Sequence, residues 1–145
     1  MPAAVDSAFE LAFWFCDRAL NDNEYLQPIK LHYLMFLAQA YYATAYQGKK
    51  LIPAIFVAEE VGPIEPSVFR AWSLGRPKFE GKNTIHEDAA AFADSVWKRF
   101  GHHSVEHLAK FCRKTPCYLT ALDRGRRAEI HLSEMISSFS KSQNA

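Results

Sequence analysis

Residues 28–47 form the stretch that most limits how this chain can fold. Pro28 suits the first turn of a helix, where a missing N–H is not needed, and Gly48 is a good C-terminal stop. Between them, apolar side chains recur at helical spacing, and further apolar residues cover most of the remaining faces. A helix that is apolar nearly all round is a buried helix. We therefore predict a central helix around which the rest of the chain packs.

Weaker helical patterns flank this segment on both sides. A helix is predicted over residues 6–20, with Asp6 as its N-cap. The sequence Thr84-Ile85-His86-Glu87 matches a capping box and predicts the start of a helix that Gly101 ends. Ser104 is expected to cap the helix that follows. Further helical segments are predicted over residues 67–74, 104–113, 117–122 and 132–139, and the polar residues 140–145 are predicted to be a frayed tail.

Residues 51–61 break the helical pattern. They lack a helical period and contain Pro53, which predicts a short extended segment with at most one small strand pair. Gly62-Pro63 is predicted to form a turn, and residues 75–83 a mobile loop. The predicted fold class is therefore mainly α. Residues 1–145 are expected to form one compact, single-domain helical bundle, with a small strand pair near residues 51–61.

Charge, hydropathy and cysteine spacing indicate the compartment and the classes of partner expected for this chain. The net charge is +1, which gives no overall electrostatic attraction to nucleic acid or membranes. No stretch approaches the roughly 20 consecutive apolar residues that span a bilayer, and the acidic N-terminal segment does not resemble a signal peptide. Three cysteines without metal-ligand spacing fit free thiols in a reducing compartment. We therefore expect a cytoplasmic protein with no membrane partner.

The residue types that carry chemistry do not form a recognisable catalytic or metal-binding set. His103 and His107 share a helix face at a spacing used by zinc sites, with His102 and Cys112 nearby, but the HExxH pattern is absent. Cys16 and Cys112 fall on apolar helix faces, which favours core positions over activated nucleophiles. No phosphate-binding glycine loop or nucleophile elbow is present. The sequence therefore predicts neither an enzyme nor a bound metal or cofactor.

Positive charge is concentrated in the C-terminal part of the chain. Residues 1–60 carry four Lys or Arg against seven Asp or Glu, whereas residues 61–145 carry thirteen against nine. The densest cluster comprises Lys110, Arg113, Lys114, Arg124, Arg126 and Arg127. Such a cluster could meet phosphates or an acidic protein face, or could simply be solvated. Our hypothesis is that Arg124, Arg126 and Arg127 contact a partner.

Three segments carry a pattern that covers nearly the whole chain. The first is residues 29–42 (IKLHYLMFLAQAYY), the second runs from Ala58 through Gly62-Pro63-Ile64 to residues 66–70 (PSVFR), and the third is residues 130–139. Together they resemble the Panacea domain, the SocA-like family of bacterial and phage antitoxins. That family reads roughly L-K-L-Q-K-L-L-Y-F-A-Q-A-x-Y in the first segment and A-W-x-Y-G-P-V-x-P-x-V-Y in the second.

The chain departs from the family pattern at four positions. His32 and Tyr33 stand in place of a Gln-Lys pair, and Glu59 and Val61 replace two aromatic residues before the Gly-Pro. These changes are compatible with the domain fold but alter any partner surface built on them. The motif residues that we expect to hold the fold are Leu31, Leu34, Phe36, Ala38, Gly62, Pro63 and Pro66.

The resemblance implies a helical domain that neutralises a cognate toxin by direct contact. One member of the family also acts as an adaptor that hands its toxin to a ClpXP-type protease, so an adaptor role is a further possibility. The expected function is therefore protein binding, with a toxin or client protein as partner. The alternative is a nucleic-acid-associated regulator that uses the basic C-terminal cluster, and we expect nucleic acid to be the less favoured partner.

Overall fold

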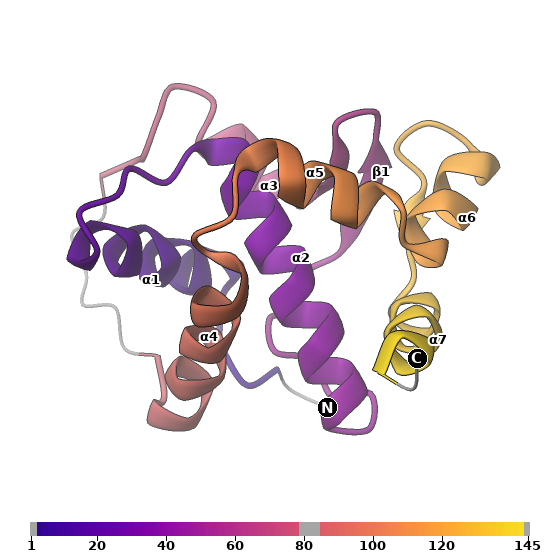
Figure 1. Ribbon diagram of the computed structural model, residues 1–145, viewed down its shortest axis with the longest axis horizontal. Helices are drawn as coiled ribbons and strands as arrows, with labels where there is room; N and C mark the ends of the chain where they lie inside the picture. Colours follow the sequence, from indigo (N-terminus) through magenta and orange to yellow (C-terminus); the bar gives the residue numbers. More distant parts are fainter. Residues whose placement is uncertain (1–2, 79–84, 144–145) are drawn as a thin grey trace.

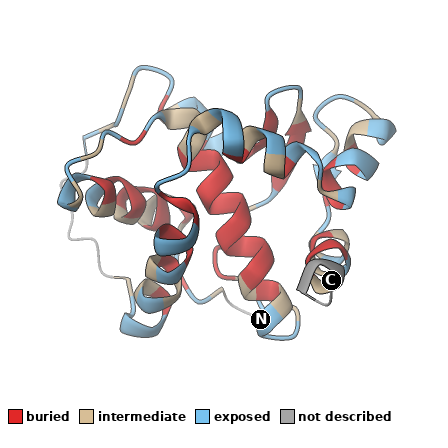
Figure 2. Cartoon of the chain, viewed as in Figure 1, coloured by how far each residue is buried: buried red, intermediate tan, exposed pale blue. Residues whose placement is uncertain are grey.

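The central segment of the chain is the helix that the sequence predicts. In the computed structural model, which describes residues 3–78 and 85–143, helix α2 spans Pro28–Ala45. Figure 1 shows α2 passing through the middle of the molecule, and Figure 2 shows it buried along almost its whole length. The motif side chains of Leu31, Leu34, Phe36 and Ala38 are fully buried. The prediction of a buried central helix is confirmed.

Within the described residues, six further helices surround α2. Helices α1, α3, α4, α5 and α7 contact α2 directly, and α6 packs against α7 and the sheet (Figure 1). The described residues thus form a mainly helical, compact single domain with one small sheet, which confirms the predicted fold class. The bounds are α1 Ala8–Asn21, α3 Pro66–Ala71, α4 Glu87–Phe100, α5 Val105–Arg113, α6 Pro116–Arg124 and α7 Leu132–Gln143.

Several helix ends differ from the predictions. Helix α1 is capped by Ser7 rather than Asp6, because the Ser7 Oγ accepts a hydrogen bond from the Phe9 amide at 3.1 Å. Ser and Asp are equally good caps, so the sequence does not choose between neighbours. Helix α7 runs on to Gln143, through part of the predicted frayed tail. Residues 144–145 lie outside the described residues. The ends of α2, α3 and α6 also differ by one to three residues from the predicted ends, which is the usual uncertainty at helix termini.

The N-terminus of α4 also differs from its prediction, whereas that of α5 agrees. The cap of α4 is His86, whose Nδ1 accepts from the Asp88 amide at 3.3 Å. Thr84, the predicted cap, lies outside the described residues, as do residues 79–83 of the predicted loop. Ser104 caps α5 by accepting from the His107 amide at 3.1 Å.

A three-stranded antiparallel sheet, in the order β2-β1-β3, is the only sheet in the described part of the chain. Strands β1 (Phe56–Glu59) and β2 (Gly62–Ile64) form a hairpin, and β3 (Glu129–Ile130) pairs with the other edge of β1. The predicted Gly62-Pro63 turn is wrong, since both residues belong to β2 and Pro63 pairs with Ala58. The turn is formed by Glu60 and Val61. Pro63 is tolerated because β2 is an edge strand.

One buried polar side chain on α2 fixes the chain that leads into the sheet. The Gln39 Oε1 accepts hydrogen bonds from the amides of Leu51 and Ile52 at 2.9 and 3.1 Å, and its Nε2 donates to the Ile52 carbonyl at 3.0 Å. These bonds satisfy both the amide side chain and three buried backbone groups. No helix in the described residues has the length and apolar character needed to cross a bilayer.

Candidate functional site

Two buried tyrosines from different helices hold the turn of the β1–β2 hairpin. The Tyr33 hydroxyl, on α2, donates to the Val61 carbonyl, and the Tyr118 hydroxyl, on α6, donates to the Glu59 carbonyl. Burial raises the pKa of Tyr33 to about 12 and also raises the pKa of Tyr118. Both phenols therefore stay protonated at neutral pH and act as donors. The turn is fixed to the core at each of its ends.

Gly62 is required at the start of β2 for two reasons. Its φ of 134° lies in the region that side-chain-bearing residues rarely adopt. A Cβ at this position would also lie 2.7 Å from Cε1 of the buried Tyr33 ring. The glycine thus allows the tyrosine to approach the hairpin closely enough to donate its hydrogen bond.

The junction between β2 and α3 depends on two further buried polar groups. The His32 Nδ1 accepts a hydrogen bond from the Glu65 amide at 3.1 Å, and burial lowers the pKa of His32 to about 4. The histidine is therefore neutral at physiological pH. The Glu65 carboxylate caps α3 by accepting from the Val68 amide at 2.7 Å and from the Ser67 hydroxyl at 2.8 Å. This arrangement sets the direction in which α3 leaves the sheet.

A groove of about 810 Å³ lies between the hairpin, α3 and the start of α2, and we call it the hairpin groove. Two large apolar side chains in it are unusually accessible: Val61 is 49% exposed and Phe69 is 53% exposed. Exposed apolar groups gathered in a concave site are typical of surfaces that bind a partner. The apolar wall comprises Ile29, Val57, Val61, Ile64, Pro66 and Phe69, and the charged residues are Glu59, Arg70 and Arg127.

The three arginines predicted to contact a partner do not form one surface. Arg127 pairs with Glu59 at 2.7 Å, and Arg126 reaches the same carboxylate at 3.5 Å. Arg124 instead pairs with Glu134 on α7 at 2.6 Å. The hydrogen bonds of that pair raise the pKa of Arg124 and lower the pKa of Glu134. Only Arg127 lines the hairpin groove, and each of the three arginines faces a carboxylate within the fold.

The remaining members of the predicted basic cluster line a second groove, of about 820 Å³, which we call the basic groove. Lys110, Arg113 and Lys114 are exposed there, at the end of α5. Glu60 and Glu106 lie in the same groove and offset part of this charge. The hairpin turn therefore contributes to both grooves, with Val61 in one and Glu60 in the other.

The histidines and cysteines considered as metal ligands or nucleophiles are placed apart from both grooves. The rings of His103 and His107 stack at a centroid distance of 4.4 Å. Burial raises the pKa of Cys16, Cys112 and Cys117, so these thiols are poorly ionised. Across residues 3–78 and 85–143, no group of three or more His, Cys, Asp or Glu side chains is arranged to hold a metal ion.

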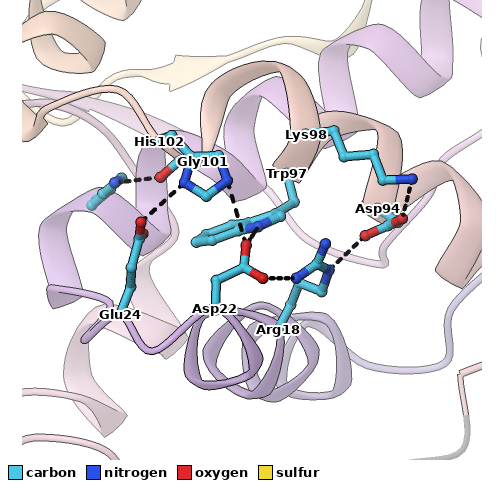
Figure 3. A network of polar contacts seen from close by, with 9 residues as sticks. Arg18, Asp22, Glu24, Asp94, Trp97, Lys98, Gly101 and His102 are labelled. Carbon is cyan, nitrogen blue, oxygen red and sulfur yellow. Dashed lines mark hydrogen bonds and ion pairs between the residues drawn. The ribbon is translucent and has the colours of Figure 1, made fainter.

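A separate polar network joins the C-terminal parts of α1 and α4 (Figure 3). Arg18 pairs with Asp22 and with Asp94, in each case at 2.7 Å, and the Trp97 indole donates to Asp22 at 2.8 Å. Hydrogen bonds from Trp97 and Arg18 lower the pKa of Asp22, and the bond from Arg18 lowers the pKa of Asp94. His102 extends the network to Glu24 at 3.0 Å. These contacts bind the two helices together.

Sequence reasoning missed the groups that shape the hairpin groove. Val61, Phe69 and Arg70 lie in or beside the motif segments, but nothing in the local pattern shows that their side chains are exposed together. Pro66, predicted to hold the fold, is exposed and lines this groove at the first turn of α3. The apolar Val61 would have been a signal only with the turn placed at Glu60 and Val61, because polar residues are more common in turns.

In the comparisons with known proteins, no family model, no curated protein and no solved structure matches this chain. The resemblance to the Panacea domain therefore stays a prediction that depends on the motif residues themselves.

Proposed function

We propose that this protein is a protein-binding module that acts as an antitoxin, neutralising a cognate toxin by direct contact. In the adaptor form of this proposal, the bound toxin is delivered to a ClpXP-type protease. The proposal assigns the chain no catalytic reaction and places its work in the cytoplasm.

The hairpin groove is the observation that carries this proposal. Its walls come from the segments on which the Panacea resemblance depends: Ile29 at the start of the first, and Val61, Ile64, Pro66 and Phe69 from the second. Two of these side chains, Val61 and Phe69, are about half exposed although they are large and apolar. Covering them with a partner would remove that surface from water, which is the main favourable term in protein association.

The chemistry of the described nucleophiles supports a binding role over a catalytic one. A catalytic cysteine needs a depressed pKa and access to substrate. Cys16, Cys112 and Cys117 are buried, and burial raises the pKa of each. The buried tyrosines and His32 are likewise engaged in hydrogen bonds to the backbone, where they support the hairpin.

The proposal is tested in cells with the product of the reading frame that neighbours this gene. That product should stop growth when it is expressed alone, and co-expression of this protein should restore growth. Phe69→Ser should abolish the rescue, because it removes an exposed apolar wall of the groove. Leu119→Ser is the matched control, since Leu119 is 50% exposed but lies in the basic groove. If cells that express the neighbouring product grow equally well with and without this protein, the proposed function is contradicted.

The adaptor form has its own measurement. Purified toxin should be degraded by ClpXP faster when this protein is added, and Phe69→Ser should remove the acceleration. Neutralisation without any change in degradation would leave a simple antitoxin and contradict the adaptor form.

The basic groove favours a second candidate, a nucleic-acid-associated regulator. Lys110, Arg113 and Lys114 are exposed on one short stretch, and contacts from such residues to phosphates release counterions. A mobility shift with duplex DNA should then weaken steeply as salt rises and should be lost in Lys110→Glu/Lys114→Glu. A shift that is absent at low salt contradicts this candidate.

A further inference from the structure

The hairpin groove combines accessible apolar groups with accessible positive charge. We infer that it binds a short peptide segment of a partner protein in which apolar side chains lie next to an aspartate or glutamate. This inference rests on the proposed function, since it names the kind of partner segment that the protein-binding groove recognises.

The apolar requirement follows from how the groove is built. Val61 stands on the hairpin turn and Phe69 on α3, and both face solvent over about half of their surface. The hydrogen bond from Tyr33 to the Val61 carbonyl and the cap that Glu65 provides to α3 hold these two elements in place. The groove is therefore formed before a partner arrives, which lowers the entropic cost of binding.

The acidic requirement follows from which charges are accessible. The groove holds one carboxylate, Glu59, and two guanidinium groups, Arg70 and Arg127. The Glu59 side chain is only 17% exposed, whereas that of Arg127 is 70% exposed. In the described part of the chain, no carboxylate lies within ion-pair distance of Arg70, which is itself exposed. A bound segment therefore meets a positive groove, and a carboxylate complements it.

The backbone at Arg127 adds an independent observation. Arg127 has a φ of 62°, a left-handed conformation that is uncommon for a residue other than glycine. Its amide donates to the Ala58 carbonyl at 3.0 Å, and the Ala58 amide donates to the Ala128 carbonyl at 2.9 Å. The pairing with β1 holds this conformation and directs the guanidinium toward Glu59 at the edge of the groove. The backbone therefore fixes the position of the Arg127 guanidinium at the groove.

The test is a selection of random peptides displayed on phage against the purified full-length protein. Selected peptides are synthesised with a fluorescent label, and their affinities are measured by anisotropy for wild type and variants. We expect the selected sequences to share two apolar residues close to an Asp or Glu. Phe69→Ser and Arg70→Glu should each weaken binding about tenfold or more, because both groups contact the peptide. Leu119→Ser and Lys114→Glu, in the basic groove, should change it by no more than about twofold.

A charge swap sharpens the test. For one selected peptide, the acidic residue is replaced by Lys, which should abolish binding to wild type and restore part of it to Arg70→Glu. Melting temperatures of all variants close to that of wild type show that the changes act on binding.

Three results overturn the inference: no enriched sequence, enriched sequences without an acidic residue, or affinities that Phe69→Ser and Arg70→Glu leave unchanged. If no peptide is enriched but the protein binds duplex DNA, and Arg70→Glu abolishes that binding, the ligand of the groove is nucleic acid and not a peptide. The selection uses no toxin, so its failure is distinguishable from a failure of the growth rescue.

Discussion

The hairpin groove and the basic groove are nearly equal in volume, about 810 and 820 Å³, and share the turn of one hairpin, but they expose different groups. The hairpin groove exposes Val61 and Phe69 and places Arg127 against Glu59. The basic groove exposes Lys110, Arg113 and Lys114 beside two carboxylates. The fold, and not the run of basic residues alone, therefore decides which charges are paired and which apolar groups stay open.

The largest expected effect tests whether the hairpin depends on the close approach of Tyr33. Gly62→Ala should destabilise the fold by about 3 kcal/mol, because it adds backbone strain and a clash with the buried ring. Gly125→Ala is the matched control: Gly125 also has a positive φ, 147°, but apart from its own and its chain neighbours' atoms nothing lies within 4 Å of its added Cβ. Urea unfolding of both variants measures the difference. Equal losses would show that Tyr33 does not constrain this position.

The next effect is the dependence of folding stability on pH that we expect from His32, which supports the junction between β2 and α3. The pKa of His32 is about 4 in the folded chain and about 6.5 in the unfolded chain. The unfolded state therefore binds a proton first as pH falls. Stability should be highest above pH 6.5, should decline by about 3 kcal/mol between pH 6.5 and pH 4, and should then receive no further change from this group.

The variant His32→Gln isolates this contribution. Its amide oxygen is an acceptor for the Glu65 amide but does not titrate, so the decline between pH 6.5 and pH 4 should flatten. The carboxylates whose pKa is lowered, Asp22, Asp94 and Glu134, lose their stabilising effect at lower pH. A variant with the same pH profile as wild type would assign the decline to another group.

A smaller effect compares the two tyrosines that hold the turn. Tyr33→Phe and Tyr118→Phe each remove a hydroxyl that donates to a turn carbonyl, and each should cost about 1–2 kcal/mol in the free energy of unfolding. In the peptide assay, Tyr33→Phe should weaken binding more than Tyr118→Phe, because only Tyr33 holds Val61 in the hairpin groove. The opposite order would place the binding surface on the basic side of the turn.

The smallest effect in stability compares two carboxylates that pair with the predicted arginines. Glu59→Gln and Glu134→Gln should each change the free energy of unfolding by less than about 1 kcal/mol, since their arginine partners are exposed. Glu59→Gln alone should tighten the binding of acidic peptides at low salt, because it frees Arg126 and Arg127 next to the groove. If Glu59→Gln and Glu134→Gln bind the peptide with equal affinity, Glu59 does not lie at the binding surface.

The sequence predicted the parts of the fold that depend on repeated local patterns. The buried α2 and the cap at Ser104 follow from apolar spacing and cap chemistry, and both are confirmed. Strand β3 spans only two residues, too few for an alternating pattern, so it was not predicted. Gly62-Pro63 has the composition of a turn, but pairing with β1 makes it a strand.

The candidate site was less predictable, because its geometry depends on contacts between distant segments. The pairs of Arg127 with Glu59 and of Arg124 with Glu134 join residues that no local pattern connects, so the sequence did not show that these arginines face carboxylates within the fold. The exposure of Phe69 depends on the angle at which α3 leaves β2, which is set by His32 and Glu65 in the interior.

The buried position of α2 has a consequence for how this protein could change over time. The helix carries the core residues and also His32 and Tyr33, which support the hairpin. If the proposed function holds, a substitution at either position changes stability and partner recognition together, so few replacements there should be tolerated. Phe69 and Arg70 lie on the outside of α3 and can vary at little cost to folding. Divergent copies of this chain could therefore acquire new partners through α3 while the interior stays the same.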